Sequence, residues 1–318
     1  MAELDLGDLR RRLGGAGIAD VAPLSGGASG LTFVGTASGE RVVIKVAPPG
    51  VEPVAHRDVL RQARIIKALA GSGVPVPAVL WEDEGDPPGT PPLYVMAHVE
   101  GDCVEPLFDD CPPIGGLSER YRNVCRAMAA LHTLAPTDLG LGDEPAVDPV
   151  AEVHRWSGTL RTVDPALVPD WPKVRDALLD CAPRAMTPRV VHGDFRLGNV
   201  LATGSRVNAV IDWEIWSIGD PRIDAGWFLI NCDPDTYRRV APDGTVPPIG
   251  ELAELYESEL GCAVSDLAWF RALACFKSAA TWSLIVKHNR RRASPRAELE
   301  AMAATLPGLL DRARSLLD

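Results

Sequence analysis

The chain has 318 residues, a net charge of −11 and 46% hydrophobic residues, a composition ordinary for a globular protein with room for two compact lobes. The acidic balance argues against nucleic acid as a partner, since phosphate backbones are bound by an excess of lysine and arginine. No apolar run approaches the ~20 residues that span a bilayer. The acidic N-terminal segment, with no apolar run behind it, is unlike a signal peptide. We therefore expect a cytoplasmic protein with no membrane partner.

The first third of the sequence reads as strands and turns. Residues 31–36 and 41–47 are rich in β-branched side chains, and the segment Ala37-Ser38-Gly39-Glu40 between them is typical of a hairpin. Further strands are predicted at 21–25, 76–81 and 93–99. A helix is predicted over 54–70. The pattern predicts a five-stranded sheet with one helix.

After Gly101 a helical periodicity replaces the strand pattern. The predicted helices cover 118–135, 150–161, 171–181, 222–232, 250–260, 266–290 and 295–317. Ser294 is the expected N-cap of the last helix, with Pro295 at its first position. A short β island at 189–212 interrupts the helices. We expect two domains, residues 1–97 and residues 98–318.

Seven cysteines are scattered along the chain without a CxxC pair or a nearby histidine at zinc-ligand spacing. They are Cys103, Cys111, Cys125, Cys181, Cys232, Cys262 and Cys275. We interpret them as reduced core residues.

The strongest chemical signal is an ordered set made of His192-Gly193-Asp194, Asn199 and Asp212. Phosphoryl transfer needs a carboxylate that orients or deprotonates the attacking hydroxyl, and oxygen ligands that hold Mg²⁺ against the donor phosphates. Asp194 fits the first role, and Asn199 and Asp212 fit the second. A hairpin through residues 203–205 would bring Asp212 back beside Asn199. A lone loop aspartate is more often a solvated turn residue, but the complete set favours a site.

The wording around this set resembles the aminoglycoside phosphotransferase family, whose fold is that of protein kinases. The segments that carry the resemblance are 191–201 (VHGDFRLGNVL), 209–214 (AVIDWE) and 219–224 (GDPRID). The first is most similar to the kinase-like domains of acyl-CoA dehydrogenase fusion proteins. The resemblance implies an α+β, bilobal fold with a small five-stranded antiparallel N-lobe that binds nucleotide. The larger, mostly helical C-lobe would carry the catalytic loop and the acceptor-binding helices.

The family also implies roles for single residues. Asp194 would be the catalytic base, and Asn199 and Asp212 would bind Mg²⁺. His192 would brace the catalytic loop and Asp224 would tether it, without reacting. Arg196 could offset the charge that develops on the transferring phosphoryl group, or it could be a structural or solvent-facing arginine.

The donor, ATP or GTP, would be held by three segments of the first lobe. Glycines in Leu24–Leu31 let the backbone approach phosphates, although a plain hairpin turn is the alternative reading. The candidates there are Ser25, Gly26, Gly27 and Ser29. Lys45 resembles the strand-three lysine that contacts the α- and β-phosphates. Met96 and His98 lie where the family's hinge would receive the base.

Gln62 departs from the kinase pattern. A glutamate on the helix usually orients the strand-three lysine, whereas Gln62 could donate or accept a hydrogen bond but adds no charge. Either the ion pair is dispensable or Lys45 is held by another group. The departure also motivates a second hypothesis, a nucleotide-binding pseudokinase or sensor with no transfer activity.

The acceptor would be a hydroxyl of a small molecule, and the sequence leaves its class open, from aminoglycosides and amino alcohols to sugars and hydroxy acids. The sequence also leaves the oligomeric state open. An aminoglycoside would need acidic side chains, and the candidates are Asp233, Asp235, Glu251 and Glu254. The alternative is that these four side chains form a solvated helix face. An anionic acceptor would need cations; the candidates are Lys277, Lys287 and Arg290. We interpret Lys277 as a lysine with a buried stem and an exposed head.

Overall fold

The computed structural model describes residues 4–24, 31–104, 115–237 and 245–318. The chain divides into two compact units, residues 1–103 with 198–216 and residues 104–197 with 217–318. These units differ from the predicted domains, 1–97 and 98–318, chiefly because residues 198–216 group with the first unit. The domain boundary therefore stays a prediction. None of the described helices has the length and apolar character needed to cross a membrane.

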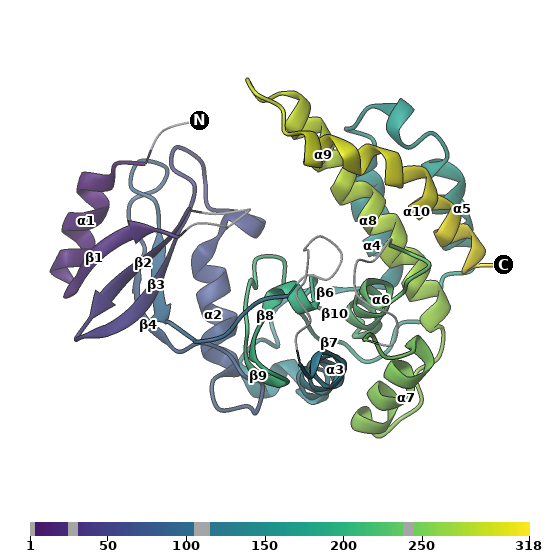
Figure 1. Ribbon diagram of the computed structural model, residues 1–318, viewed down its shortest axis with the longest axis horizontal. Coiled ribbons are helices and arrows are strands. Elements are labelled where there is room, and N and C mark those ends of the chain that lie inside the picture. Colours follow the sequence, from purple (N-terminus) through teal and green to yellow (C-terminus); the bar gives the residue numbers. More distant parts are fainter. Residues whose placement is uncertain (1–3, 25–30, 105–114, 238–244) are drawn as a thin grey trace. The chain divides into compact units, whose positions relative to one another are not determined.

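A five-stranded antiparallel sheet forms the centre of the first unit, in the order β1-β2-β3-β5-β4 (Figure 1). Its strands are β1 (Ile18–Pro23), β2 (Leu31–Ala37), β3 (Glu40–Val46), β4 (Val79–Asp83) and β5 (Leu93–Ala97). Ser38 and Gly39 connect β2 to β3 with φ of 50° and 85°, as expected for a tight hairpin. The predicted sheet is confirmed.

Side chains alternate across β3, so that Val42, Ile44 and Val46 are buried on one face while Lys45 points to the other. Helix α1 (Leu6–Gly15) packs Leu9 and Leu13 into the same core. This helix was not predicted. The signal was present, because apolar residues at its i and i+4 positions follow Asp5, which caps the helix by accepting from the Asp8 N–H.

The predicted helix over 54–70 begins later than expected. A single 3₁₀ turn (Ala55–Arg57) precedes α2 (Val59–Leu69), which packs against β4 and β5. The reason is Asp58, whose carboxylate accepts from the Arg61 N–H at 3.0 Å and so fixes the first helical turn.

The hairpin of β8 (Val200–Thr203) and β9 (Arg206–Val210) belongs to the first unit through backbone contacts. Asp102 bridges to Ala202, and the Val210 N–H donates to the Pro75 carbonyl at 2.8 Å. Gly101 makes the bridge possible, since a Cβ on it would lie 2.8 Å from the Ala202 nitrogen. Beyond the hairpin, Arg61 stacks on the Trp216 ring at 3.8 Å. These contacts hold residues 198–216 to the sheet unit.

The second unit is mostly helical. Its helices are α3 (Leu117–Thr133), α4 (Pro149–Leu160), α5 (Trp171–Asp180), α6 (Arg222–Asn231), α7 (Ile249–Leu260), α8 (Leu267–Arg290), α9 (Ala297–Ala301) and α10 (Leu306–Ser315). A small sheet joins β10 (Ser217–Gly219) to β6 (Ala146–Val147) in parallel and to β7 (Arg189–Val191) antiparallel. The predicted helices up to residue 290 agree with these bounds within two residues.

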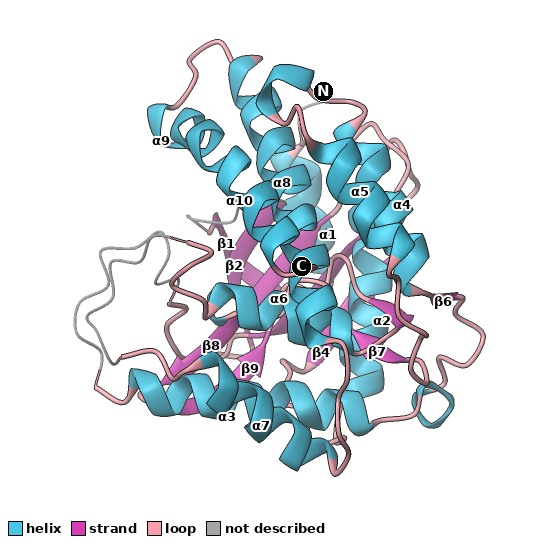
Figure 2. Cartoon of the chain, turned by 90° about the vertical axis from the view of Figure 1, so that its right-hand side faces the viewer, coloured by secondary structure: helices cyan, strands magenta, loops and turns pink. Residues whose placement is uncertain are grey.

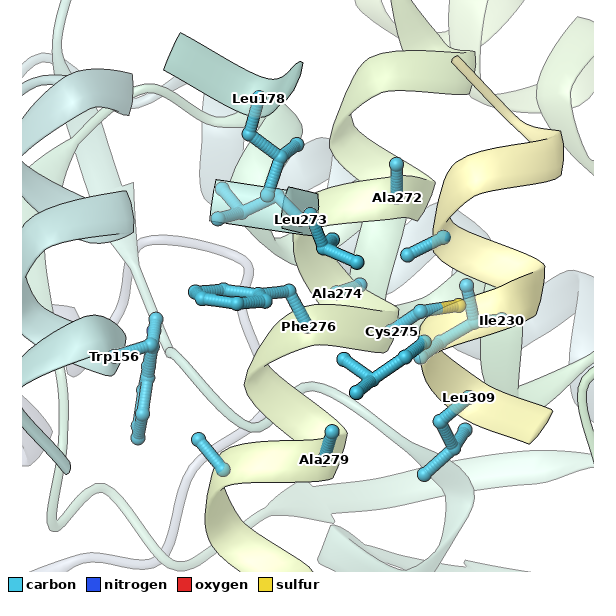
Figure 3. Close-up of a cluster of buried hydrophobic side chains, with 14 of the residues drawn as sticks. Trp156, Leu178, Ile230, Ala272, Leu273, Ala274, Cys275, Phe276, Ala279 and Leu309 are labelled. Atoms are coloured by element: carbon cyan, nitrogen blue, oxygen red, sulfur yellow. The ribbon is translucent and has the colours of Figure 1, made fainter. Parts of the chain in front are cut away.

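The core of the second unit surrounds α8, which runs between α4, α5, α6 and α10 (Figure 2). Side chains from all four neighbours meet it, among them Trp156 of α4, Leu178 of α5, Ile230 of α6 and Leu309 of α10 (Figure 3). Because α8 is buried on nearly all sides, it has no single polar face along most of its length.

The predicted helix over 295–317 is wrong as one element. It is divided into α9, a 3₁₀ turn (Met302–Thr305) and α10, because Pro307 lacks an N–H and fits only at the start of a helix. The predicted cap, Ser294, is also wrong. Helix α9 begins after Arg296, whose N–H and carbonyl both bind the side chain of Asn289 at 2.9 Å.

No disulfide joins any two of the six described cysteines, and Cys111 lies outside the described residues. The core interpretation holds for Cys125, Cys232 and Cys275 and is wrong for Cys103, Cys181 and Cys262, which are exposed. Burial raises the pKa of the Cys125 and Cys275 thiols to about 12, so both stay protonated near neutral pH.

Candidate active site

The segment 192–196, here called the catalytic loop, follows β7 in the second unit. Its backbone is fixed by Asp224, in the first turn of α6, whose two carboxylate oxygens accept from the His192 N–H at 2.6 Å and the Gly193 N–H at 2.8 Å. Gly193 has φ of 86°, a conformation that glycine adopts without strain. Asp224 thus tethers the loop, as the family pattern implies.

Asp224 is completely buried, and its charge is supported by a chain of hydrogen bonds. His132 Nε2 lies 3.3 Å from Asp224 Oδ2, and His132 Nδ1 lies 2.7 Å from the Tyr256 hydroxyl. Burial by itself would raise the pKa of the Asp224 carboxyl, but the His132 hydrogen bond and the charges nearby lower it below its ordinary value. The loop is therefore anchored on an ionised carboxylate.

The Asp194 carboxylate is held by two side chains. The Trp227 indole Nε1–H donates to Asp194 Oδ1 at 2.8 Å, and Arg196 Nε lies 3.2 and 3.3 Å from the two oxygens. The Asp194 N–H donates to His192 Nδ1 at 3.1 Å, which makes His192 a brace. Arg196 thus contacts the candidate base itself. Trp227 was not predicted, because the sequence places it on a helix 33 residues away.

Lys277 is buried to 4% exposure, so its interpretation as a lysine with an exposed head is wrong. Its Nζ donates to the Gly193 carbonyl and lies 4.1 Å from the Trp227 ring centroid. Burial lowers the pKa of the Lys277 ammonium, and the carboxylates of Asp194, Glu152 and Asp224 oppose that change. The sequence could not reveal the burial, since it depends on the helices packed around α8.

The first unit brings together Lys45, Asp212 and Asn199. Lys45 Nζ lies 3.1 Å from Asp212 Oδ1, and the Ile211 N–H donates to the Asn199 carbonyl at 2.9 Å. The hairpin therefore returns Asp212 to the neighbourhood of Asn199, as predicted. Asp212 has φ of 67°, a left-handed conformation that is uncommon outside glycine and recurs at functional sites.

Gln62 does not orient Lys45 in this structure. Its Nε2 reaches the His56 carbonyl at 3.5 Å, and its buried Oε1 has no hydrogen-bond partner among the described residues. Lys45 is instead held by Asp212. Of the two possibilities that the sequence left open, the structure supports the second, in which another group holds the lysine.

The oxygen donors of Asn199 and Asp212 fit a hard cation such as Mg²⁺. The Asn199 side chain is buried, the Asp212 side chain is 29% exposed, and the backbone hydrogen bond next to them fixes both on one hairpin. Mg²⁺ in nucleotide sites is usually bound by one or two protein oxygens, with water and phosphate filling the other positions. The two residues therefore suffice as the protein's share of such a site.

The remaining nucleotide candidates are only partly described. Ser25, Gly26, Gly27 and Ser29 lie outside the described residues. Met96 is buried in β5, and the His98 N–H donates to the Arg41 carbonyl at 3.1 Å, as the Ala97 N–H does to the Ala78 carbonyl. These two N–H donors are used within the sheet, so base binding at Met96 and His98 stays a prediction.

Three of the four acidic side chains that were candidates for binding an aminoglycoside form ion pairs with arginines. Asp233 is buried and accepts from Arg271 and Arg312, each at 2.7 Å. Glu251 lies 2.6 Å from Arg122. Asp235 lies 3.6 Å from Arg312, and Glu254 is exposed. These carboxylates do not form a cluster open to a cationic ligand.

The three cations proposed for an anionic acceptor differ in their burial and in their partners. Lys287 donates to the Thr162 carbonyl at 2.6 Å near the surface. Arg290 forms ion pairs with Glu300 at 2.7 Å and Asp164 at 3.8 Å. Only Lys277, among these three, contacts the catalytic loop.

Comparison with known proteins identifies the protein family to which the chain belongs. The sequence matches the model of the phosphotransferase enzyme family (APH) over residues 20–273. Acyl-CoA dehydrogenase family member 11 of Gallus gallus is 31% identical over 290 residues, which are 83% of this chain and 36% of that protein. The chain spans about a fifth to a third of the length of the first curated relatives it matches.

Two solved structures share the fold. A Ralstonia eutropha JMP134 protein, provisionally described as an aminoglycoside phosphotransferase, aligns with a TM-score of 0.80 at 23% identity, covering 99% of this chain and 98% of that one. A thermostable mutant of aminoglycoside phosphotransferase APH(4)-Ia, in complex with AMP-PNP and hygromycin B, aligns with a TM-score of 0.64 at 15% identity, covering 98% and 97%.

The chain belongs to the phosphotransferase enzyme family. Its α+β fold is the kinase-like fold of the aminoglycoside phosphotransferases. The resemblance inferred from the motifs around Asp194 is thereby confirmed.

Proposed function

We propose that this protein transfers the γ-phosphoryl group of ATP, or of GTP, to a hydroxyl of a small molecule in the presence of Mg²⁺. The observation that carries the proposal is the Asp194 carboxylate, oriented by Trp227 and Arg196 on a loop that Asp224 fixes. The nucleotide complex of the related APH(4)-Ia structure supports a nucleotide as donor.

Asp194 is the proposed base. Its side chain is 26% exposed, so an acceptor can reach it. The carboxylate would accept the hydrogen bond of the acceptor hydroxyl and take its proton as the new oxygen–phosphorus bond forms and the bond to the leaving nucleotide breaks. Arg196, already beside Asp194, would offset negative charge on the transferring group.

Lys45, Asn199 and Asp212 are the proposed donor-binding set. Asn199 and Asp212 would hold Mg²⁺, which neutralises charge on the donor phosphates when it is bound. Lys45, in contact with Asp212, would bind the α- and β-phosphates. The proposal assigns the other phosphate contacts to Ser25, Gly26, Gly27 and Ser29, and the base to the strand around Met96 and His98.

We propose an acceptor without a cluster of ammonium groups, such as a sugar or a hydroxy acid. Asp233 is neutralised by two arginines, and Glu251 is paired with a third. The charged groups next to Asp194 include two cations, Arg196 and Lys277. A polycation would meet like charge there, which disfavours binding.

Asp194→Asn tests the proposed base, because it keeps the size of the side chain but removes the proton acceptor. We expect transfer to fall about 1000-fold while the Kd for nucleotide stays nearly unchanged. Asp164→Asn, at an exposed position of the same unit, is the matched control and should retain full activity. Acceptors are screened by ADP release over a panel of sugars, hydroxy acids, amino alcohols and aminoglycosides, and products are identified by mass spectrometry. Full activity in Asp194→Asn would refute the assignment.

The pseudokinase alternative rests on Gln62, which leaves Lys45 without a glutamate partner. It predicts nucleotide binding with no product from any member of the panel. A single phosphorylated product from the wild-type protein, absent with Asp194→Asn, eliminates it.

A further inference from the structure

Lys277 is the only lysine among the described residues that is buried. Its neighbours on α8, including Phe276 and Ala279, fill the core with apolar groups (Figure 3). An apolar side chain of the same length would pack here without the cost of taking a charge out of water. A buried ammonium in such a position is therefore better explained by what it contacts than by packing.

The contacts of the ammonium are specific. Trp227 and Trp156 present their rings at 4.1 and 5.5 Å, within the range of cation–π attraction. The Nζ donates to the Gly193 carbonyl. One helix thus places a single positive charge between two indole rings and the backbone of the catalytic loop.

The Gly193 carbonyl belongs to the peptide group that carries the Asp194 N–H. Lys277 holds the carbonyl end of this peptide, and His192 Nδ1 accepts from its N–H end at 3.1 Å. Asp224 holds the preceding N–H, that of Gly193. The peptide that leads into the candidate base is therefore fixed at both ends, at the carbonyl by the Lys277 ammonium and at the N–H by His192.

Trp227 connects the same ammonium to the Asp194 side chain. The Lys277 ammonium lies near the ring of this indole, and the indole Nε1–H donates to Asp194 Oδ1 at 2.8 Å. A cation over the ring draws electron density toward itself, which makes the N–H a stronger donor. The charge of Lys277 thus acts on Asp194 both through the backbone and through the indole.

We propose that Lys277 is a positioning residue of the transfer reaction, which together with Trp227 fixes the orientation of the Asp194 carboxylate. The inference rests on the proposed function, since it assumes that Asp194 is the base. It assigns no contact between Lys277 and either substrate.

The charge of Lys277 acts among several others. The groups that face the Lys277 ammonium or the Asp194 carboxylate are His192, Asp194 and Arg196 of the catalytic loop, Glu152 and Arg155 of α4, and Asp224 of α6. Among these groups the Lys277 ammonium contacts both the Gly193 carbonyl and the ring of Trp227, so removing it weakens two of the contacts that orient Asp194.

Lys277→Met removes the charge and the donor at nearly constant volume. We expect kcat to fall about 100-fold, as for a small displacement of a catalytic group, with little change in the Kd for ATP. Lys277→Arg keeps the charge and a donor and should recover most of kcat, and Lys173→Met, at an exposed lysine of α5, should match wild type.

Trp227→Phe keeps a ring and removes the N–H. It should lower kcat in the same way, and the double variant with Lys277→Met should be no less active than the less active of the two single variants, because both act on one carboxylate. Additive losses, or a Lys277→Met enzyme with wild-type kcat, would overturn the proposal. If Lys277→Met fails to fold, a wild-type kcat in Trp227→Phe would also overturn the proposal.

A spectroscopic measurement separates this inference from the proposed function. The indole N–H resonance of Trp227, assigned by its loss in Trp227→Phe, is compared in wild type, Lys277→Arg and Lys277→Met. Its chemical shift should differ from that of wild type only in Lys277→Met, where the cation over the ring is absent, whether or not the protein turns over any acceptor. An unchanged chemical shift in Lys277→Met contradicts the role of Lys277, while the expected change together with no transfer by the wild-type protein contradicts the proposed function alone.

Discussion

At the scale of single residues, Asp224 is the group whose charge the fold most depends on. Its carboxylate is fully buried and accepts from the backbone of His192 and Gly193 and lies beside His132. Its pKa is lower in the folded protein than in the unfolded chain. The ionised form therefore stabilises the fold at pH values above the unfolded pKa of about 4, and this contribution is lost as the pH falls through the folded pKa.

Asp224→Asn should consequently lower the free energy of unfolding by about 3 kcal/mol at pH 7. The difference from wild type should shrink as the pH is lowered below about 4, where Asp224 becomes protonated in the unfolded chain, and it should disappear below the folded pKa. Urea unfolding at several pH values measures it, with the exposed Asp176→Asn as the control. A difference that stays constant down to pH 3 would show that charge is not the cause.

The catalytic loop shows which site residues a sequence can reveal. Asp194, Asn199 and Asp212 lie within a segment of 19 residues whose sequence is typical of a family, so the motif identifies all three as candidate site residues. Trp227 and Lys277 contact the same loop from α6 and α8. No local pattern distinguishes such residues from core tryptophans and surface lysines, because their role depends on how distant helices pack.

At the scale of elements, the closest approach in the second unit is that of α6 to α8. A Cβ on Gly226 of α6 would lie 2.4 Å from the Phe270 carbonyl of α8, a distance that no packed atom tolerates. Glycine here allows two helix backbones to touch. The contact positions both Trp227 and Lys277, since each is on one of these two helices.

Gly226→Ala should force α6 and α8 apart and lower the free energy of unfolding by about 3 kcal/mol. Gly158→Ala is the matched control, because it is also helical but has open space around the added Cβ, and it should stabilise the protein by about 0.5 kcal/mol. Thermal or urea unfolding compares the two. Equal effects of both substitutions would contradict the close contact.

Element boundaries were predictable where a side chain or a proline ends the regular backbone. The β2–β3 hairpin followed from Ser38-Gly39, and most helices of the second unit followed from apolar periodicity. Two of the differences have local causes that the sequence contains: Asp5 caps the unpredicted helix α1, and Pro307 divides the helix predicted over 295–317.

At the scale of the whole molecule, the first unit is discontinuous in sequence. The bridge between Asp102 and Ala202, and the bond from the Val210 N–H to the Pro75 carbonyl, join its two segments. A reading along the chain could not foresee this, because the β island predicted at 189–212 carries no local sign of which unit its strands join. Strand partners so distant in sequence leave no local signal.

A fragment of residues 1–103 should therefore fold poorly, since Arg61 and the Pro75 carbonyl lose their partners in residues 198–216. Joining residues 198–216 to it through a flexible linker of about eight residues should restore a cooperative transition. Circular dichroism and urea unfolding compare the two, with a shuffled 198–216 segment as the control. Cooperative unfolding of 1–103 alone would refute the prediction.

The same discontinuity imposes a delay during protein synthesis, because the two segments of the first unit leave the ribosome at different times. A ribosome that adds ~5–20 residues per second takes roughly 6–20 s to pass from residue 103 to residue 216. Throughout that interval the emerging sheet exposes the surface that the 198–216 hairpin covers. This nascent chain is the stage at which a chaperone, or a slowed codon, has the most influence on yield.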